Sequence, residues 1–324
     1  MAKRIFELTP ADVANLDRQG LLKAIVSSVG RTLLAEAMAT VPPLLGSVSN
    51  AELAAAMGAD VIVLNVYDVQ QPLVMGLPSR PEAAAGLSGT LPGPVAGLVS
   101  PETLGLGVTV GDVKRLIGRP VGIMLEPGPE GSIAVPPGRR ATPDNCRLAL
   151  DQGADLIVIS GNPGTGVTWP VIVAATKAAH KAVGDRVVIV AGEMHYAGPG
   201  GEGGRGLFAA ADISDLAKAG ADVVLLPAPG TVQGVTVAVA AGWVEAAHAA
   251  GMLALLAIGT SQEGSAVETV TRIAELTKQA GADICHIGDA GYCGMAMPEN
   301  IMAYSTAIRG RAHTYRRIAL GFRR

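Results

Sequence analysis

The sequence predicts an α/β protein, a (β/α)8 TIM barrel with an N-terminal capping helix and a C-terminal helical extension. Eight short, nearly continuous apolar runs recur along the chain, as expected for strands buried on both faces. Glycine-rich turns follow the last two runs, where such barrels commonly hold a phosphate or another oxyanion. The expected strands are 32–37, 61–66, 121–125, 156–160, 187–191, 223–226, 253–258 and 284–287.

The other segments fit a single barrel domain, residues 1–324. Thr9 and Pro10 suit the cap and first position of a helix that runs to about Val29, so residues 1–30 are expected to close the bottom of the barrel. Residues 298–324 are expected to form the last helix and a basic tail. A Gly-Ala-Asp tripeptide precedes every second strand and indicates a two-strand building unit. Its four copies begin at Gly58, Gly153, Gly220 and Gly281.

The composition indicates a globular protein with an ample core, because 49% of the 324 residues are hydrophobic. The net charge of −3 shows no excess that would favour nucleic acid. The apolar runs are far shorter than the ~20 residues of a membrane span. The N-terminus lacks the apolar core of a signal peptide, so we expect a cytoplasmic protein. The three cysteines lack CxxC spacing, which disfavours structural zinc and a disulfide framework.

Acidic residues interrupt or follow several expected strands, at the end where barrels carry their active sites. Carboxylates that converge on one barrel mouth repel each other unless a cation or a shared proton intervenes. We therefore expect Mg²⁺ or Mn²⁺ bound by Glu36, Asp68 and Glu126. The other interpretation is that each acid caps a helix or pairs with an arginine, namely Arg139, Arg140 or Arg205.

Glu193 and His195 are the expected catalytic residues. They lie two positions apart after the fifth strand and therefore share a direction if the strand persists. A carboxylate beside an imidazole is a workable acid–base pair, although His195 could equally be a polar residue at the start of a loop. We expect His286, inside the eighth strand, to be a hydrogen-bonded core residue. The lysines avoid the carboxyl ends of the strands and no GxGxxG follows the first strand, so no Schiff-base lysine, PLP or NAD is expected.

Glycine-rich turns are the expected binding sites for substrate or phosphate, because backbone N–H groups there can point at an anion. A longer glycine-rich stretch, 197–206, is interpreted as a lid that orders on ligand binding, with a linker of no role as the alternative. The expected binding residues are Asn162, Gly164, Thr165, Gly166, Gly259, Thr260, Ser261, Gly288, Asp289 and Gly291.

Five stretches carry a resemblance to a known family: GNPGTGVT (161–168), LLPAPGTV (225–232), AIGTSQEG (257–264), HIGDAGYCG (286–294) and PENIMAYSTAIRGRAHTYRR (298–317). They resemble a bacterial TIM-barrel family usually labelled phosphoenolpyruvate phosphonomutase-like and sometimes haloacid-dehalogenase-like. The first label implies Mg²⁺ held by acids such as Asp68 and Glu126, although Glu126-Pro127-Gly128 replaces that superfamily's paired aspartates. A dehalogenase mechanism is rejected, because the DxDx[TV] nucleophile motif is absent from the first strand.

Residues and resemblance together predict a lyase or isomerase. It would act on a small phosphorylated or carboxylate metabolite through a metal-stabilised, enolate-like intermediate. Two other functions stay open, a metal-dependent phosphohydrolase and a non-catalytic metabolite-binding barrel. We expect a homo-oligomer that forms through the C-terminal helix, with a small-molecule substrate and no nucleic-acid or membrane partner.

Overall fold

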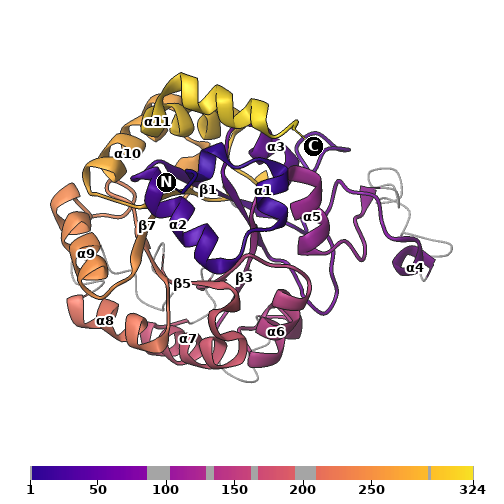
Figure 1. The fold of residues 1–324 in the computed structure, drawn as a ribbon, viewed down its shortest axis with the longest axis horizontal. Helices are drawn as coiled ribbons and strands as arrows, with labels where there is room; N and C mark the ends of the chain where they lie inside the picture. Colours follow the sequence, from indigo (N-terminus) through magenta and orange to yellow (C-terminus); the bar gives the residue numbers. More distant parts are fainter. Residues whose placement is uncertain are drawn as a thin grey trace.

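The chain forms a closed barrel of parallel strands that neighbour one another in sequence order (Figure 1). The computed structural model describes residues 2–85, 103–128, 135–161, 167–193, 209–290 and 293–323. The predicted (β/α)8 fold is confirmed, and every strand lies within one residue of its expected bounds. The strands are β1 (Thr32–Met38), β2 (Val61–Asn65), β3 (Val121–Leu125), β4 (Leu156–Ile159), β5 (Val188–Gly192), β6 (Val223–Pro227), β7 (Leu253–Ile258) and β8 (Ile284–Ile287).

Helices between the strands surround the barrel (Figure 1). A short helix, α4 (Pro81–Ala84), projects to one side of this ring. Single 3-10 turns, among them η4 (Pro137–Arg139) and η6 (Gln262–Gly264), shape the loops at the carboxyl ends of the strands. No helix in the described ranges is long and apolar enough to cross a membrane. The main helices are α3 (Asn50–Ala56), α5 (Val110–Ile117), α6 (Pro143–Asp151), α7 (Trp169–Val183), α8 (Ala210–Ala219), α9 (Val237–Ala249), α10 (Val267–Gln279) and α11 (Pro298–Leu320).

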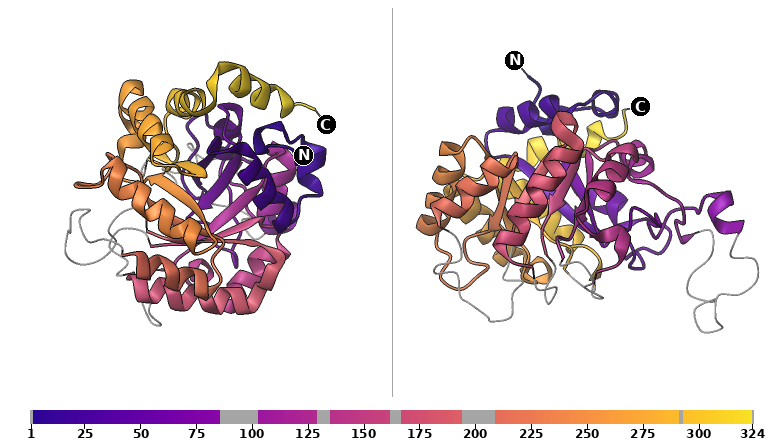
Figure 2. Two further views of the ribbon diagram at one scale, coloured as in Figure 1. Left: turned by 60° about the vertical axis from the view of Figure 1, so that its left-hand side comes forward. Right: turned by 90° about the horizontal axis from the view of Figure 1, so that it is seen from below.

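The N-terminal segment closes one end of the barrel, as the sequence predicts, but it is not one helix (Figures 1 and 2). It consists of η1 (Ile5–Glu7), α1 (Pro10–Ala14) and α2 (Arg18–Ser28). Asp17 breaks the expected helix because its carboxylate accepts the N–H of Gly20 at 2.7 Å and starts a new helix there. Apolar residues of all three elements pack into the bottom of the barrel against inward-facing strand residues.

The barrel interior changes from apolar to polar along the strands. Successive strand residues point to opposite faces, so residues two apart share a face. The apolar interior cluster that contacts the N-terminal helices includes Leu34, Val63, Met124, Val158 and Ile284. Two positions further along the same strands stand polar residues: Glu36, Asn65, Glu126, Ser160 and His286. The carboxyl end of the barrel interior is therefore polar.

The Gly-Ala-Asp copies have a common structure at the other end of the barrel. The glycines have positive φ values, such as 105° at Gly58, which suit the left-handed end of a helix. Each aspartate carboxylate accepts the N–H of a residue in the preceding strand, and its own N–H donates to that residue's carbonyl. For Asp60 and Leu33 these distances are 2.9 and 2.8 Å. The equivalent pairs are Asp155 with Val121, Asp222 with Ile189 and Asp283 with Ala254.

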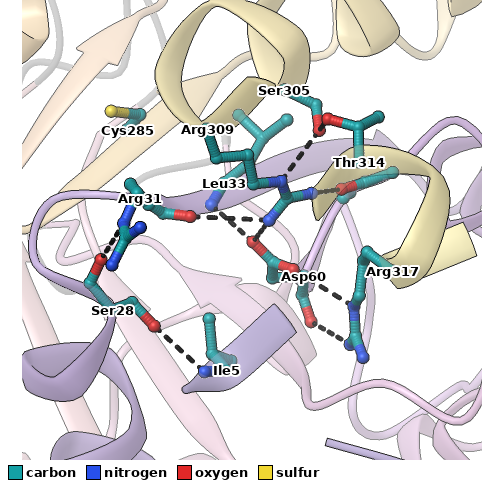
Figure 3. Close-up of polar contacts among 12 residues, drawn as sticks. Ile5, Ser28, Arg31, Leu33, Asp60, Cys285, Ser305, Arg309, Thr314 and Arg317 are labelled. Carbon is teal, nitrogen blue, oxygen red and sulfur yellow. Dashed lines mark hydrogen bonds and ion pairs between the residues drawn. The ribbon is translucent and has the colours of Figure 1, made fainter. Parts of the chain in front are cut away.

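Asp60 differs from the other copies because two buried arginines of α11 meet its carboxylate (Figure 3). Arg309 pairs with Oδ2, and Nε of Arg317 lies 3.1 Å from Oδ1. Gly310, with φ 78° and ψ 159°, breaks α11 between the two arginines. The expectation of a basic tail is therefore wrong for Arg309 and Arg317, which are internal and cannot serve an oligomer contact. The homo-oligomer itself stays a prediction.

Candidate active site

Glu36 and His286 meet inside the barrel at its carboxyl end. Glu36 follows the inward-facing Leu34 on β1, and His286 follows the inward-facing Ile284 on β8. Nε2 of His286 lies 3.7 Å from Oε1 of Glu36, and each side chain is only 3% exposed. The two groups therefore form a buried carboxylate–imidazole pair.

The second ring nitrogen of His286 is buried without a partner among the described residues. Nδ1 is buried and makes no hydrogen bond within the part of the chain that the structure describes. His286 is buried, as expected, but the expected hydrogen bond is not found at Nδ1. A neutral ring with its proton on Nε2, toward Glu36, has Nδ1 as an acceptor. A buried acceptor of this kind can take a proton or a hydrogen bond from a ligand.

A second carboxylate, Glu263 of η6, lies beside this pair. It is 2% exposed, and its Oε2 is buried with no hydrogen-bond partner among the described residues. Burial raises the pKa of Glu263, the nearby imidazole of His286 opposes this shift, and the charges of Asp289 and Glu36 reinforce it. Its carboxylate fills the space beside Gly288, where a Cβ would overlap Oε1. The turn after β8 is therefore packed on the Glu263 side chain.

Asp289 joins the ends of two strands that are not neighbours. Its Oδ2 accepts a hydrogen bond from Nδ2 of Asn65, at the end of β2, at 2.8 Å. Because β8 and β2 flank β1, this bond spans the mouth above Glu36. Glu36, Asn65, His286 and Asp289 thus belong to one polar group.

Glu193 is a buried acid that follows β5. Its side chain is 7% exposed, and burial raises the pKa of Glu193 to about 7. A carboxyl group that titrates near neutral pH can both give and take a proton. Its predicted partner His195 lies outside the described residues.

The three predicted metal ligands do not assemble into a metal site. Glu126 is 1% exposed and forms an ion pair with Arg139 from the loop after β3. Oδ1 of Asp68 accepts the backbone N–H groups of Gln70 and Gln71 at 2.8 and 3.0 Å. Within the described ranges, no three His, Cys, Asp or Glu side chains are placed to hold a metal ion.

These partners explain why the three acids do not come together among the described residues. The loop after β3 brings an arginine to Glu126, which was the alternative left open by the sequence. The side chain of Asp68 lies against Gly138, where a Cβ would overlap its carboxylate, so it joins the loops after β2 and β3. Glu126 is thus paired with an arginine, and Asp68 caps a backbone turn.

The expected anion-binding turns are partly described. Asn162, Gly164, Thr165, Gly166 and Gly291, and the expected lid 197–206, lie outside the described residues. After β7, the hydroxyl of Thr260 donates to the carbonyl of Thr231 at 3.2 Å, and Ser261 is exposed with a φ of 74°. Gly259 is half-buried at the end of β7, and Gly288 and Asp289 lie next to Glu263. Phosphate binding at these turns stays a prediction.

Sequence reasoning missed two members of the site. Side chains alternate between the two faces of a strand, so His286 shares the inward face of β8 with Ile284. The sequence alone could have indicated this position. Glu263 gives no such signal, because it lies in a loop and becomes buried only through the packing of η6 beneath Gly288. The burial of such an acid in a loop can be recognised only from the three-dimensional structure.

Residues 6–324 match the family described as Domain of unknown function (DUF7916), and the chain belongs to that family. The comparison with curated proteins gives no match.

Two solved structures are similar in outline. An archaeal fructose 1,6-bisphosphate aldolase has a TM-score of 0.49 and 13% identity, covering 89% of this chain and 98% of its own. The thiamine phosphate pyrophosphorylase from Pyrococcus furiosus has a TM-score of 0.46 and 12% identity, covering 86% of this chain and 96% of its own. Both scores are below 0.5, so the fold assignment rests on the strand order of the barrel, and the site rests on its own geometry.

Proposed function

We propose that this chain is an enzyme that moves a proton on a small carboxylate or phosphorylated metabolite, in a lyase or isomerase reaction at the barrel mouth. The observation that carries the proposal is the buried Glu36–His286 pair, whose Nδ1 atom has no partner among the described residues. A base oriented by a carboxylate is the usual arrangement for proton abstraction. The phosphonomutase-like activity implied by the sequence resemblance is one reaction within this class and stays a prediction.

The proposed step uses two groups. Nδ1 of His286 takes a proton from the carbon next to a substrate carbonyl, and Glu36 stabilises the positive charge that forms on the ring. The electron pair of the broken C–H bond forms a C=C bond, and the carbonyl oxygen takes a proton, for which we propose Glu193 as the donor. Because the pKa of Glu193 is about 7, a large fraction of it carries that proton at neutral pH. Return of a proton at another carbon gives isomerisation, and loss of a group from the neighbouring carbon gives a lyase.

The substrate's anionic group would lie in an acidic surrounding. At the turn after β8 it would meet Glu263 and Asp289, and two carboxylates would repel it. Because burial raises the pKa of Glu263, its neutral form is available to donate a hydrogen bond to an anion. We therefore propose that the substrate binds with Glu263 protonated, and that its affinity falls as the pH rises.

Mg²⁺ or Mn²⁺ has no ligand set among the described residues, so no step is assigned to a metal. Metal binding stays a prediction that a thermal shift can test, since a ligand of the folded state raises the melting temperature. If the predicted trio held a metal, E126Q would abolish a shift produced by Mg²⁺. We expect any such shift to be unchanged in E126Q.

The experiment is a deuterium-exchange screen. The full-length protein is incubated in D₂O with three- to six-carbon oxo acids and phosphorylated sugars, and mass spectrometry measures deuterium uptake. We expect enzyme-dependent uptake at the carbon next to a carbonyl, without release of inorganic phosphate. Phosphate release without uptake would instead establish the phosphohydrolase. A compound that raises the melting temperature but takes up no deuterium would establish the binding barrel.

A further inference from the structure

Three arginines are buried at the bottom of the barrel, on the side opposite the proposed active site. Arg119, just before β3, is 2% exposed, and Arg309 and Arg317 of α11 are 6% and 0% exposed. Within the described ranges, the ion pairs of this cluster share one carboxylate, that of Asp60 (Figure 3). Three cations and one anion leave two positive charges in excess. Buried charges are costly unless they are paired, so this excess requires an explanation.

Arg119 is the member without a carboxylate. Its Nε, Nη1 and Nη2 atoms donate to the carbonyl oxygens of Ala59, Gly118 and Arg317 at 3.3, 3.2 and 3.1 Å. A guanidinium has five N–H groups, so one remains on each terminal nitrogen. Burial and the neighbouring charge of Arg309 lower the pKa of Arg119 to about 10, against the opposing effect of Asp60. An anion would relieve both effects.

A pocket of about 600 Å³ lies on the outer side of Arg119. The ends of α3, α5 and α11 and the start of α1 surround it, and Figure 1 shows these elements together near the C-terminus. Gly321 borders the guanidinium, and a Cβ there would lie 2.9 Å from Nη2. Arg119 and Gly321 both line the pocket, so the guanidinium, although only 2% exposed, lies at the pocket wall with no side chain of residue 321 over it.

The remaining walls are mostly apolar. Leu116 and Phe322 are 53% and 79% exposed at the rim, although large hydrophobic side chains are normally covered. The other charged lining residues are engaged. Arg115 pairs with Asp112, and Glu52 accepts the N–H and O–H of Ser49 at 2.9 and 2.8 Å as part of the α3 cap.

We propose that this pocket binds a small organic anion with an apolar tail, with its carboxylate on the free N–H groups of Arg119 and its tail against Leu116 and Phe322. Electrostatic complementarity and the uncovered apolar rim both select such a ligand over a purely polar anion. The site lies at the opposite end of the barrel from Glu36 and His286, and it is independent of the proposed reaction.

The test compares octanoate with its neutral analogue octanamide by isothermal titration of the full-length protein. We expect octanoate to bind at least tenfold more tightly than octanamide. The variant L116E places a carboxylate at the exposed rim, and we expect it to weaken octanoate binding at least tenfold. L44E, at an exposed leucine in the loop after β1, is the matched control and should bind like the wild type.

Two results would overturn the proposal. Equal binding of octanoate and octanamide, or no binding of either, would show that Arg119 recognises no carboxylate. Octanoate binding that L116E leaves unchanged would place the ligand elsewhere. Melting temperatures of both variants, measured alongside, confirm that each is folded.

Discussion

His286 and Glu36 face each other across the closing seam of the barrel, with Nε2 of the imidazole 3.7 Å from Oε1 of the carboxylate. They come from β8 and β1, the last and first strands, which pair only when the barrel closes. The pair therefore exists only in the complete fold. Its burial and the Nδ1 atom, which has no partner among the described residues, make it the centre of the proposed site.

Glu36 acts through His286, so E36Q should reduce turnover by about 10- to 100-fold without abolishing it. The amide no longer stabilises a positive charge on the ring. We therefore expect kcat to fall while KM changes little, because Glu36 acts on the ring and not on the substrate. A rise in KM with kcat unchanged would contradict this role.

Glu193 should make the protein less stable as the pH rises. Its folded pKa of about 7 lies above the ordinary value of 4.5. The stabilisation of the folded state by the tighter binding of this proton is therefore complete below pH 4.5. It is lost between pH 4.5 and 7, because the unfolded chain releases the proton first. E193Q should match the wild type at low pH and exceed its free energy of unfolding by about 1 to 3 kcal/mol at pH 8. Urea unfolding at the two pH values measures this, and a constant difference would refute it.

Asp60 should be the most important of the Gly-Ala-Asp aspartates for stability. D60N keeps an oxygen for the N–H of Leu33 but leaves Arg309 and Arg317 without a carboxylate, at a cost of about 3 to 5 kcal/mol. D283N is the matched control, because its partner His248 is 46% exposed, and it should cost about 1 kcal/mol or less. Urea unfolding of both variants measures the two losses of stability. Equal costs would mean that the backbone cap, and not the ion pairs, determines stability.

Gly288 should be required for the position of Glu263. A methyl group there overlaps the Glu263 carboxylate, so G288A should destabilise the protein by about 1 to 3 kcal/mol and impair the site. G264A is the control, because its Cβ would meet nothing within 4 Å, and it should be nearly neutral. Thermal unfolding of the two variants tests the difference. A G288A protein as stable as G264A would mean that Glu263 moves freely.

The eight strands could be predicted because each is a short apolar run bounded by glycine, a local signal that the barrel preserves. The sequence does not reveal the break at Asp17 between two helices, because the apolar pattern of a helix continues across this capping residue. The basic tail was misjudged because burial of Arg309 and Arg317 depends on Asp60, some 250 residues away in the chain.

In the candidate site, too, some features could be predicted from the sequence and others could not. Glu193 is a buried acid after a strand, and its catalytic role stays a prediction. The metal trio stays a prediction, but the partners of Glu126 and Asp68, an arginine and two backbone N–H groups, could not be predicted. Such partners come from loops whose path no local pattern specifies.

The most direct test of the account is deuterium uptake by the substrate that the D₂O screen identifies, measured for the wild type, H286Q and H248Q. His286 is buried at the mouth, whereas His248 lies exposed at the end of α9, so the second variant controls for loss of a histidine. We predict that H248Q exchanges like the wild type and that H286Q is at least 100-fold slower while still folded. Undiminished exchange in folded H286Q would contradict the assignment of the Glu36–His286 pair as the group that moves the proton.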